Sequence, residues 1–156
     1  MESRPSDVVI LSAVRTPIGA FGGTLLEVPA ARLGATVAEA ALERAGLPGE
    51  AIDETIFGCA RQAGVGPNVA RQVAWHAGVP ADRPAYTVNK ACASGLKSVT
   101  LGMQSILTGE NQVVLTGGVE QMSQIPYLLL RARWGYRLGD GSLIDAMMRD
   151  GYFCPL

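Results

Sequence analysis

Short apolar runs alternate with longer segments of helical periodicity through most of the sequence. Runs of four to seven apolar or β-branched residues, bounded by Gly, Pro or polar residues, predict strands. Segments in which apolar residues recur every three or four positions predict helices. The predicted strands cover residues 8–14, 54–59, 85–88 and 112–118, and the predicted helices cover residues 33–45, 68–77 and 92–108.

The ends of the predicted helices carry the expected residues. Gly46 and Pro48 follow the first helix, and Gly78 and Pro80 follow the second. Glycine is favoured where a helix ends, and proline cannot continue one. The third predicted helix, residues 92–108, carries larger apolar residues on one face, namely Leu96, Val99, Met103, Ile106 and Leu107.

Strands that alternate with helices predict βαβ units. Right-handed crossovers then give an α/β fold with a mainly parallel sheet and helices on both of its faces. We expect residues 1–126 to form this α/β core. The pattern weakens in residues 127–156, which predict the start of a loop region with a short helix near residues 144–148. Because this region has no closing element, we expect the sequence to stop inside a larger unit.

Composition and charge exclude several functional classes. The chain has 156 residues, of which 48% are hydrophobic and 17% charged, and its formal net charge is -1. It has no run of five like charges, so binding to nucleic acid or to an anionic membrane is not expected. The apolar run 8–14 follows Glu2 and Asp7 and is too short for a signal peptide or a membrane span. We expect a cytoplasmic protein.

The cysteines and the single histidine do not favour a metal site. Cys59, Cys92 and Cys154 form no CxxC pair, and His76 is the sole histidine. An odd number of scattered cysteines is not typical of a disulfide scaffold or a zinc ribbon. We therefore expect three free thiols and no bound metal.

Cys92 has the most suggestive position of the three cysteines. It follows the strand 85–88 and opens the predicted helix 92–108, where the carboxyl edge of a parallel sheet gathers ligands. The N–H groups of a first helical turn and the helix dipole favour a thiolate, which is the nucleophilic form. Ala93, Ser94 and Gly95 are small enough to let a substrate approach. The alternative is that Cys92 is a small buried apolar residue, as free cysteines often are.

Several segments resemble the thiolase family. After Cys92 come Ser94-Gly95-Leu96, a predicted helix, a strand and then "GGVEQMS", residues 117–123. The segments "AVRTPIGAFGG", "IDETIFG" and "GPNVARQVAWHAGVP" are also similar to thiolase sequences and occur in the family's order. The resemblance therefore covers nearly the whole chain.

The resemblance implies an acyltransferase in which Cys92 carries an acyl group as a thioester. Coenzyme A would be a substrate rather than a permanently bound cofactor, in thiolysis of 3-oxoacyl-CoA or in Claisen condensation of acetyl-CoA. The backbone N–H of Cys92 would donate to the thioester oxyanion. A homodimer or homotetramer of the full-length form is also implied.

This sequence lacks two parts of the family's chemistry. Thiolases use a histidine in a Gly-His-Pro motif and a second cysteine for acid-base work, and neither motif is present here. His76 lies inside a predicted helix and is expected to pack or to face solvent. Cys59 is expected in the core, and Cys154 matches no family role. No residue can be assigned to coenzyme A, and the chain alone is expected to be inactive in turnover.

Other features have ordinary structural explanations. Gly64, Gly66 and Pro67 predict a turn before a helix, since the Lys-Ser/Thr of a phosphate-binding loop is absent. Arg15 and Arg71 are expected to be ion-pair partners rather than phosphate ligands. Met122 is expected in the core.

Two alternative functions remain open at this point. A condensing enzyme of the ketoacyl synthase type also has a cysteine where a helix begins. A catalytically silent assembly or binding module is the alternative from another class.

Overall fold

A computed structural model describes residues 7–153, and its centre is a three-stranded parallel sheet. The strands are β1 (Glu54–Gly58), β2 (Ala85–Val88) and β3 (Val114–Gly118), in the order β2-β1-β3. Gly58, at the end of β1, pairs with Val88 of β2 and with Gly118 of β3. The three strands therefore end together at one edge of the sheet. This confirms the predicted parallel sheet.

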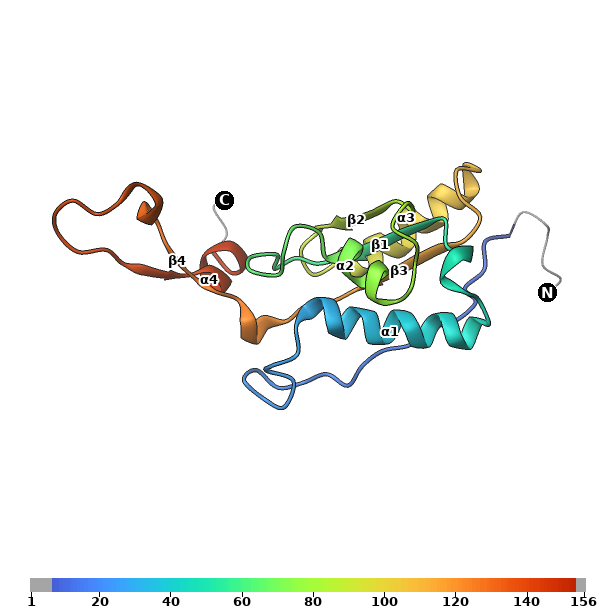
Figure 1. The fold of residues 1–156 in the computed structure, drawn as a ribbon, viewed down its shortest axis with the longest axis horizontal. Coiled ribbons are helices and arrows are strands. Elements are labelled where there is room, and N and C mark those ends of the chain that lie inside the picture. The colour runs from blue at the N-terminus through green and yellow to red at the C-terminus, as the bar shows by residue number, and fades with distance from the viewer. Residues whose placement is uncertain (1–6, 154–156) are drawn as a thin grey trace.

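Helices cover both faces of this sheet (Figure 1). Helices α1 (Ala30–Ala45) and α2 (Val69–His76) pack against each other on one face, and α3 (Ser94–Leu107) packs against β1 and β3 on the other. The predicted α/β class is confirmed. Gly46 ends α1 in the left-handed conformation, with φ 66°, as its place in the sequence indicates. Short 3₁₀ turns at Gly49–Ala51, Met122–Gln124 and Ala132–Trp134 connect the larger elements.

The main core lies between β1 and the pair α1 and α2. Phe57 is 1% exposed and packs with buried residues of both helices. Gly34 of α1 lets the helices approach closely, since a Cβ there would lie 2.5 Å from a methyl of Val73 on α2. Successive residues of a strand face opposite sides of the sheet. Gly58, the residue after Phe57 on β1, therefore faces α3.

Helix α3 faces the sheet with small residues, which are Ser94, Ser98, Gly102 and Ser105. A Cβ on Gly102 would lie 2.7 Å from a methyl of Thr116, so the helix sits very close to β3. The apolar stripe expected on this helix is present, but it points away from the sheet. Leu96 is 70% exposed and Leu107 is 61% exposed.

Residues 8–14 do not form the predicted strand, and that prediction is wrong. The segment has no strand pairing, and Val9, Ile10 and Leu11 are exposed. The segment is bonded to α1 through Ser12, whose hydroxyl donates to the carbonyl of Ala41 at 2.7 Å. An apolar run specifies a preference for burial, whereas a strand also needs a partner for its backbone. Among the described residues, β3 forms its ladder with β1 alone.

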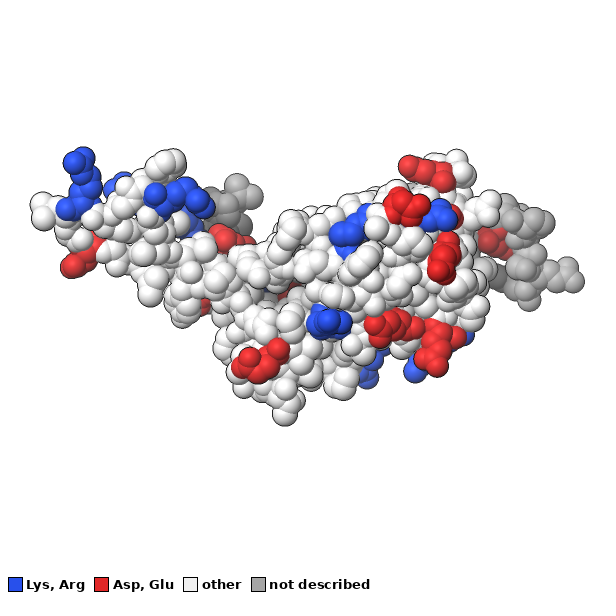
Figure 2. Space-filling model, viewed as in Figure 1, with Lys and Arg blue, Asp and Glu red and all other residues white. Residues whose placement is uncertain are grey.

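The last described residues form an arm that projects from the body (Figure 1). Strands β4 (Tyr127–Leu129) and β5 (Leu143–Asp145) pair in antiparallel fashion, and helix α4 (Ala146–Gly151) follows. The short helix expected near residues 144–148 therefore begins at Ala146, after a strand that the sequence did not predict. Figure 2 shows basic side chains along this arm, which carries Arg131, Arg133 and Arg137. The division of the chain after residue 126 stays a prediction.

Candidate active site

Cys92 lies in a tight turn between the end of β2 and the start of α3. The helix begins at Ser94, so Cys92 precedes it by two residues and does not open it as expected. The residue before it, Ala91, has a φ of 48°, a left-handed conformation that costs a non-glycine residue energy. Cys92 is a free cysteine and is exposed, so it is not the buried apolar residue of the alternative explanation.

Hydrogen bonds within the turn hold this strained backbone. The buried hydroxyl of Ser94 donates to the carbonyl of Ala91 at 2.6 Å and accepts from the N–H of Lys90 at 2.8 Å. The N–H groups of Ala93 and Ser94 donate to the carbonyls of Lys90 and Ala91, both at 3.1 Å. These hydrogen bonds therefore join the residues before Cys92 to the residues after it and hold the turn together.

Two glycines, Gly58 and Gly118, let the start of α3 lie close to the strand ends. A Cβ on Gly58 would lie 2.3 Å from the carbonyl carbon of Ser94, and a Cβ on Gly118 would lie 2.9 Å from the Cα of Gly95. Real Cβ atoms do not approach backbone so closely, and only glycine fits at these two positions. Because Gly58 and Gly118 have no side chains, the start of α3 and the Cys92 turn before it can lie this close to the sheet.

Cys59 is buried at the end of β1, as expected for a core residue. Its thiol donates to a carboxylate oxygen of Glu120 across 3.4 Å. Burial, followed by the charge of Glu120, raises the pKa of Cys59 to about 12. Cys59 therefore stays a protonated thiol at neutral pH and is no nucleophile.

The other candidates within the described residues are half-buried or donate hydrogen bonds to backbone carbonyls. His76 is half-buried in the last turn of α2. Arg15 and Arg71 donate to the carbonyls of Thr16 and Arg83, and within residues 7–153 neither forms the expected ion pair with a carboxylate. Met122 is half-buried in a 3₁₀ turn. Cys154 lies outside the described residues.

The glycine-rich segment before α2 is a turn, as predicted. Gly64 and Gly66 have φ values of 78° and 91°, and Asn68 caps α2 by accepting from the N–H of Arg71. Within residues 7–153, no three His, Cys, Asp or Glu side chains gather as a metal site would need. No helix in those residues has both the length and the apolar character to cross a bilayer.

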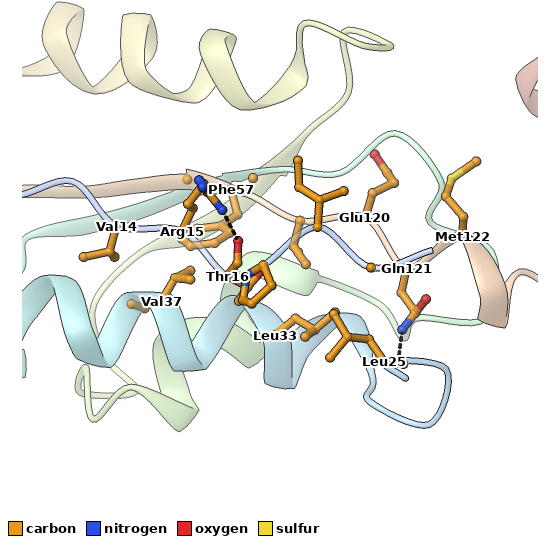
Figure 3. Close-up of a pocket in the computed structure, with 18 of the residues that line it drawn as sticks. Val14, Arg15, Thr16, Leu25, Leu33, Val37, Phe57, Glu120, Gln121 and Met122 are labelled. Carbon is orange, nitrogen blue, oxygen red and sulfur yellow. Dashed lines mark hydrogen bonds between the residues drawn. The ribbon is translucent and has the colours of Figure 1, made fainter. Parts of the chain in front are cut away.

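A large cleft lies apart from Cys92. Its volume is about 870 Å³, and it lies between residues 10–21, α1 and the end of β3 (Figure 3). Gln121 closes one side, where its amide donates to the carbonyl of Leu25 at 2.8 Å. Cys92 is not among the lining residues, so the size of this cleft says nothing about the nucleophile.

Comparison with known proteins places this architecture in a family. The thiolase N-terminal domain family matches residues 8–155. This chain belongs to the thiolase family. The acetyl-CoA acetyltransferase of Syntrophomonas wolfei is 50% identical over 147 residues, which is 93% of this chain. The acetyl-CoA acetyltransferase of Cupriavidus necator is 51% identical over 146 residues, or 94% of this chain.

A third relative has a broader name. A probable acetyl-CoA acyltransferase of Staphylococcus aureus is 51% identical over 144 residues, which is 92% of this chain. The chain spans 37% of the length of each of these three relatives. The resemblance seen in the sequence is confirmed at the level of the family.

Sequence reasoning missed the hydrogen-bonding roles of the residues that shape the turn. Asn89 links the backbone of Ala60 to that of Ala91 in the turn, and the Ser94 hydroxyl bonds to Lys90 and Ala91. Glu120 bonds to residues 59–61 of the neighbouring loop. The signal for Asn89 was available, because an asparagine just after a strand commonly caps a turn. Glu120 gave no such local signal, since its partners lie 59 to 61 positions away.

Proposed function

We propose that this chain supplies the nucleophile of a thiolase-type acyltransferase, with Cys92 as the residue that carries the acyl group. One observation carries the proposal: an exposed cysteine sits in a closed, strained turn at the carboxyl edge of a parallel sheet. Membership of the thiolase family and the names of the relatives support this assignment.

The acylation step exchanges one thioester for another. The Cys92 thiolate attacks the carbonyl carbon of an acyl-CoA, the bond from that carbon to the coenzyme sulfur breaks, and the coenzyme thiolate leaves and takes up a proton. The two thioesters have similar energies, so the intermediate is not trapped. The Cys92 N–H is the candidate oxyanion donor, because the amides of Ala91, Ala93 and Ser94 are bonded within the turn.

The carbon-carbon step needs groups that this chain does not place beside Cys92. Thiolysis of a 3-oxoacyl-CoA, or condensation with acetyl-CoA, requires an acid and a base at the α-carbon. His76 lies at the end of α2, on the opposite face of the sheet from α3. We assign this work to residues in the part of the longer relatives that this chain does not match.

The exposed stripe of α3 supports an association with that further part or with another copy. Leu96, Val99, Met103 and Leu107 point away from the sheet and are 38% to 70% exposed. A continuous apolar face of this kind marks an interaction surface. The proposed working form is therefore an assembly, with acyl-CoA and coenzyme A as its substrates.

A chimera tests the proposed function. This chain replaces the matching segment of the C. necator acetyltransferase, and thiolysis of acetoacetyl-CoA is measured by loss of the substrate's enolate absorbance. The expected result is turnover that Cys92→Ala abolishes, while the matched variant Cys59→Ala retains most of it. A soluble, folded chimera without turnover would support the silent module instead.

A further inference from the structure

We propose that Asn89 and Glu120 are positioning residues that fix the place of Cys92 through the backbone of the loop between them. This inference rests on the proposed function of Cys92 as the nucleophile. Neither side chain has to touch a substrate. They act on the end of β1, which lies between the ends of β2 and β3.

The parallel register brings these distant residues together. Beyond the paired strands, the N–H of Cys59 donates to the carbonyl of Val88 at 3.1 Å, and the N–H of Val119 donates to the carbonyl of Gly58 at 3.0 Å. The residues that follow these bonded positions are Asn89 after β2, Ala60 after β1 and Glu120 after β3. Ala60 is thus flanked by the asparagine on one side and the glutamate on the other.

Glu120 fixes the loop that contains Ala60. One carboxylate oxygen accepts from the N–H of Arg61 at 2.6 Å and from the Cys59 thiol at 3.4 Å, and the other accepts from the N–H of Ala60 at 3.1 Å. Hydrogen bonds to a charged acceptor are stronger than neutral ones. In Figure 3 the Glu120 carboxylate points away from α1, out of the apolar part of the cleft.

Asn89 connects that loop to the nucleophile turn. Its side-chain N–H donates to the carbonyl of Ala60 at 3.2 Å, and its side-chain oxygen accepts from the N–H of Ala91 at 3.0 Å. Ala91 is the residue with positive φ immediately before Cys92. The amide of Asn89 therefore holds the strained residue at a position that Glu120 defines from the other side.

The surroundings of the two residues argue for positioning rather than for a general contribution to folding. Both Asn89 and Glu120 are exposed, so neither contributes to the apolar core. The strand ladders end at Gly58 and its partners and do not include them. Their described side-chain bonds all act on residues 59–61 and 91.

Two rates measured on one cysteine test the inference. Acylation by acetyl-CoA needs an oriented sulfur and oxyanion donor, whereas iodoacetamide reacts with an exposed thiolate from many directions. In Asn89→Ala and in Glu120→Gln we expect acylation of Cys92 to fall about tenfold or more, with alkylation changed less than about threefold. Circular dichroism monitors the fold of each variant.

A matched asparagine controls for lost hydrogen bonds. Asn111 also makes two side-chain bonds, to Glu54 at 3.0 Å and to Ser105 at 2.5 Å, but at the far end of α3. Asn111→Ala should leave the acylation rate unchanged, and so should Glu39→Gln, which alters an exposed carboxylate on α1. Equal slowing in Asn111→Ala and Asn89→Ala would overturn the inference.

A second measurement does not depend on chemistry at the sulfur. In the folded Glu120→Gln protein, hydrogen exchange at the Ala91 amide should be faster than in the unaltered chain, because the hydrogen bond that this amide donates to Asn89 is loosened. Unchanged exchange, or wild-type acylation in Asn89→Ala, overturns the inference while Cys92 keeps its role. No acylation of the unaltered chain would overturn the proposed function itself.

Discussion

The glycine contact between β1 and α3 gives a prediction whose size can be worked out from distances. In Gly58→Ala the new methyl would lie 2.3 Å from the carbonyl carbon of Ser94, 2.4 Å from its oxygen and 2.5 Å from the nitrogen of Gly95. Non-bonded carbon atoms prefer separations of about 3.5–4 Å, so the strand and helix must part by about 1 Å or more. All three atoms are backbone, and no side-chain rotation relieves the clash.

Overpacking of this kind costs about 1–3 kcal/mol, and a clash with backbone belongs at the upper end of that range. The distances predict a graded series. Gly118→Ala, with its nearest atom at 2.9 Å, should cost less than Gly58→Ala. Gly95→Ala meets its nearest atom at 3.7 Å, an ordinary contact. Because alanine favours helix, that variant should be as stable as the unaltered chain or up to about 1 kcal/mol more stable.

Urea unfolding followed by circular dichroism measures the series. The free energies of unfolding should rank Gly95→Ala first, Gly118→Ala second and Gly58→Ala last. The Cys92 turn should also shift in Gly58→Ala, since it is continuous with the helix start that the methyl displaces. An unaltered urea midpoint in Gly58→Ala, or a larger loss in Gly95→Ala, would refute the close packing from which the argument starts.

Three further predictions concern thiols, surface and charge. Iodoacetamide at pH 8 should label Cys92 and spare Cys59, and because the pKa of Cys59 is raised, its contribution to stability should be full below about pH 9 and fade as the pH rises toward 12. Labelling of Cys59 in folded protein at pH 8 would contradict this. Leu96→Glu should reduce self-association in light scattering without lowering the unfolding midpoint, since this side chain is 70% exposed; an unchanged association state would exclude the α3 stripe as the contact. The N–H groups of Val113 and then Gln112 lower the pKa of Asp53, so its contribution is present above about pH 4 and is lost as the pH falls through the lowered value. Asp53→Asn should therefore cost about 1 kcal/mol at pH 7 and flatten the acid side of the stability curve, and an unchanged acid limb would rule this role out.

The sequence was sufficient for the elements whose pattern is local. The strand at residues 85–88 was predicted at its observed bounds, and Asn68 and Gly46 mark helix ends as their residue types indicate. The prediction that the larger apolar residues of α3 share one face was also correct. The pattern could not tell which face meets the sheet, because close packing through Ser98 and Gly102 reverses the usual preference for large apolar residues.

The failures come from long-range pairing. Residues 8–14 have the composition of a buried strand, but they would form a strand only by hydrogen bonding to the backbone of a neighbouring strand. The position of Cys92 after β2 was predictable, whereas its contacts were not. Asn89, Ala60 and Glu120 meet because three strands end in register, and positions 29 and 60 residues apart carry no local sign of that meeting.

The central claim is that Cys92 carries the acyl group, and mapping that group tests it most directly. The unaltered chain is incubated with acetyl-CoA, its intact mass is recorded, and the modified peptide is sequenced by tandem mass spectrometry. The account predicts one acetyl group on Cys92, removed by hydroxylamine as a thioester is, and absent in Cys92→Ser. Acetylation at Cys59 or at a lysine, or no acetylation of a folded chain, would contradict it.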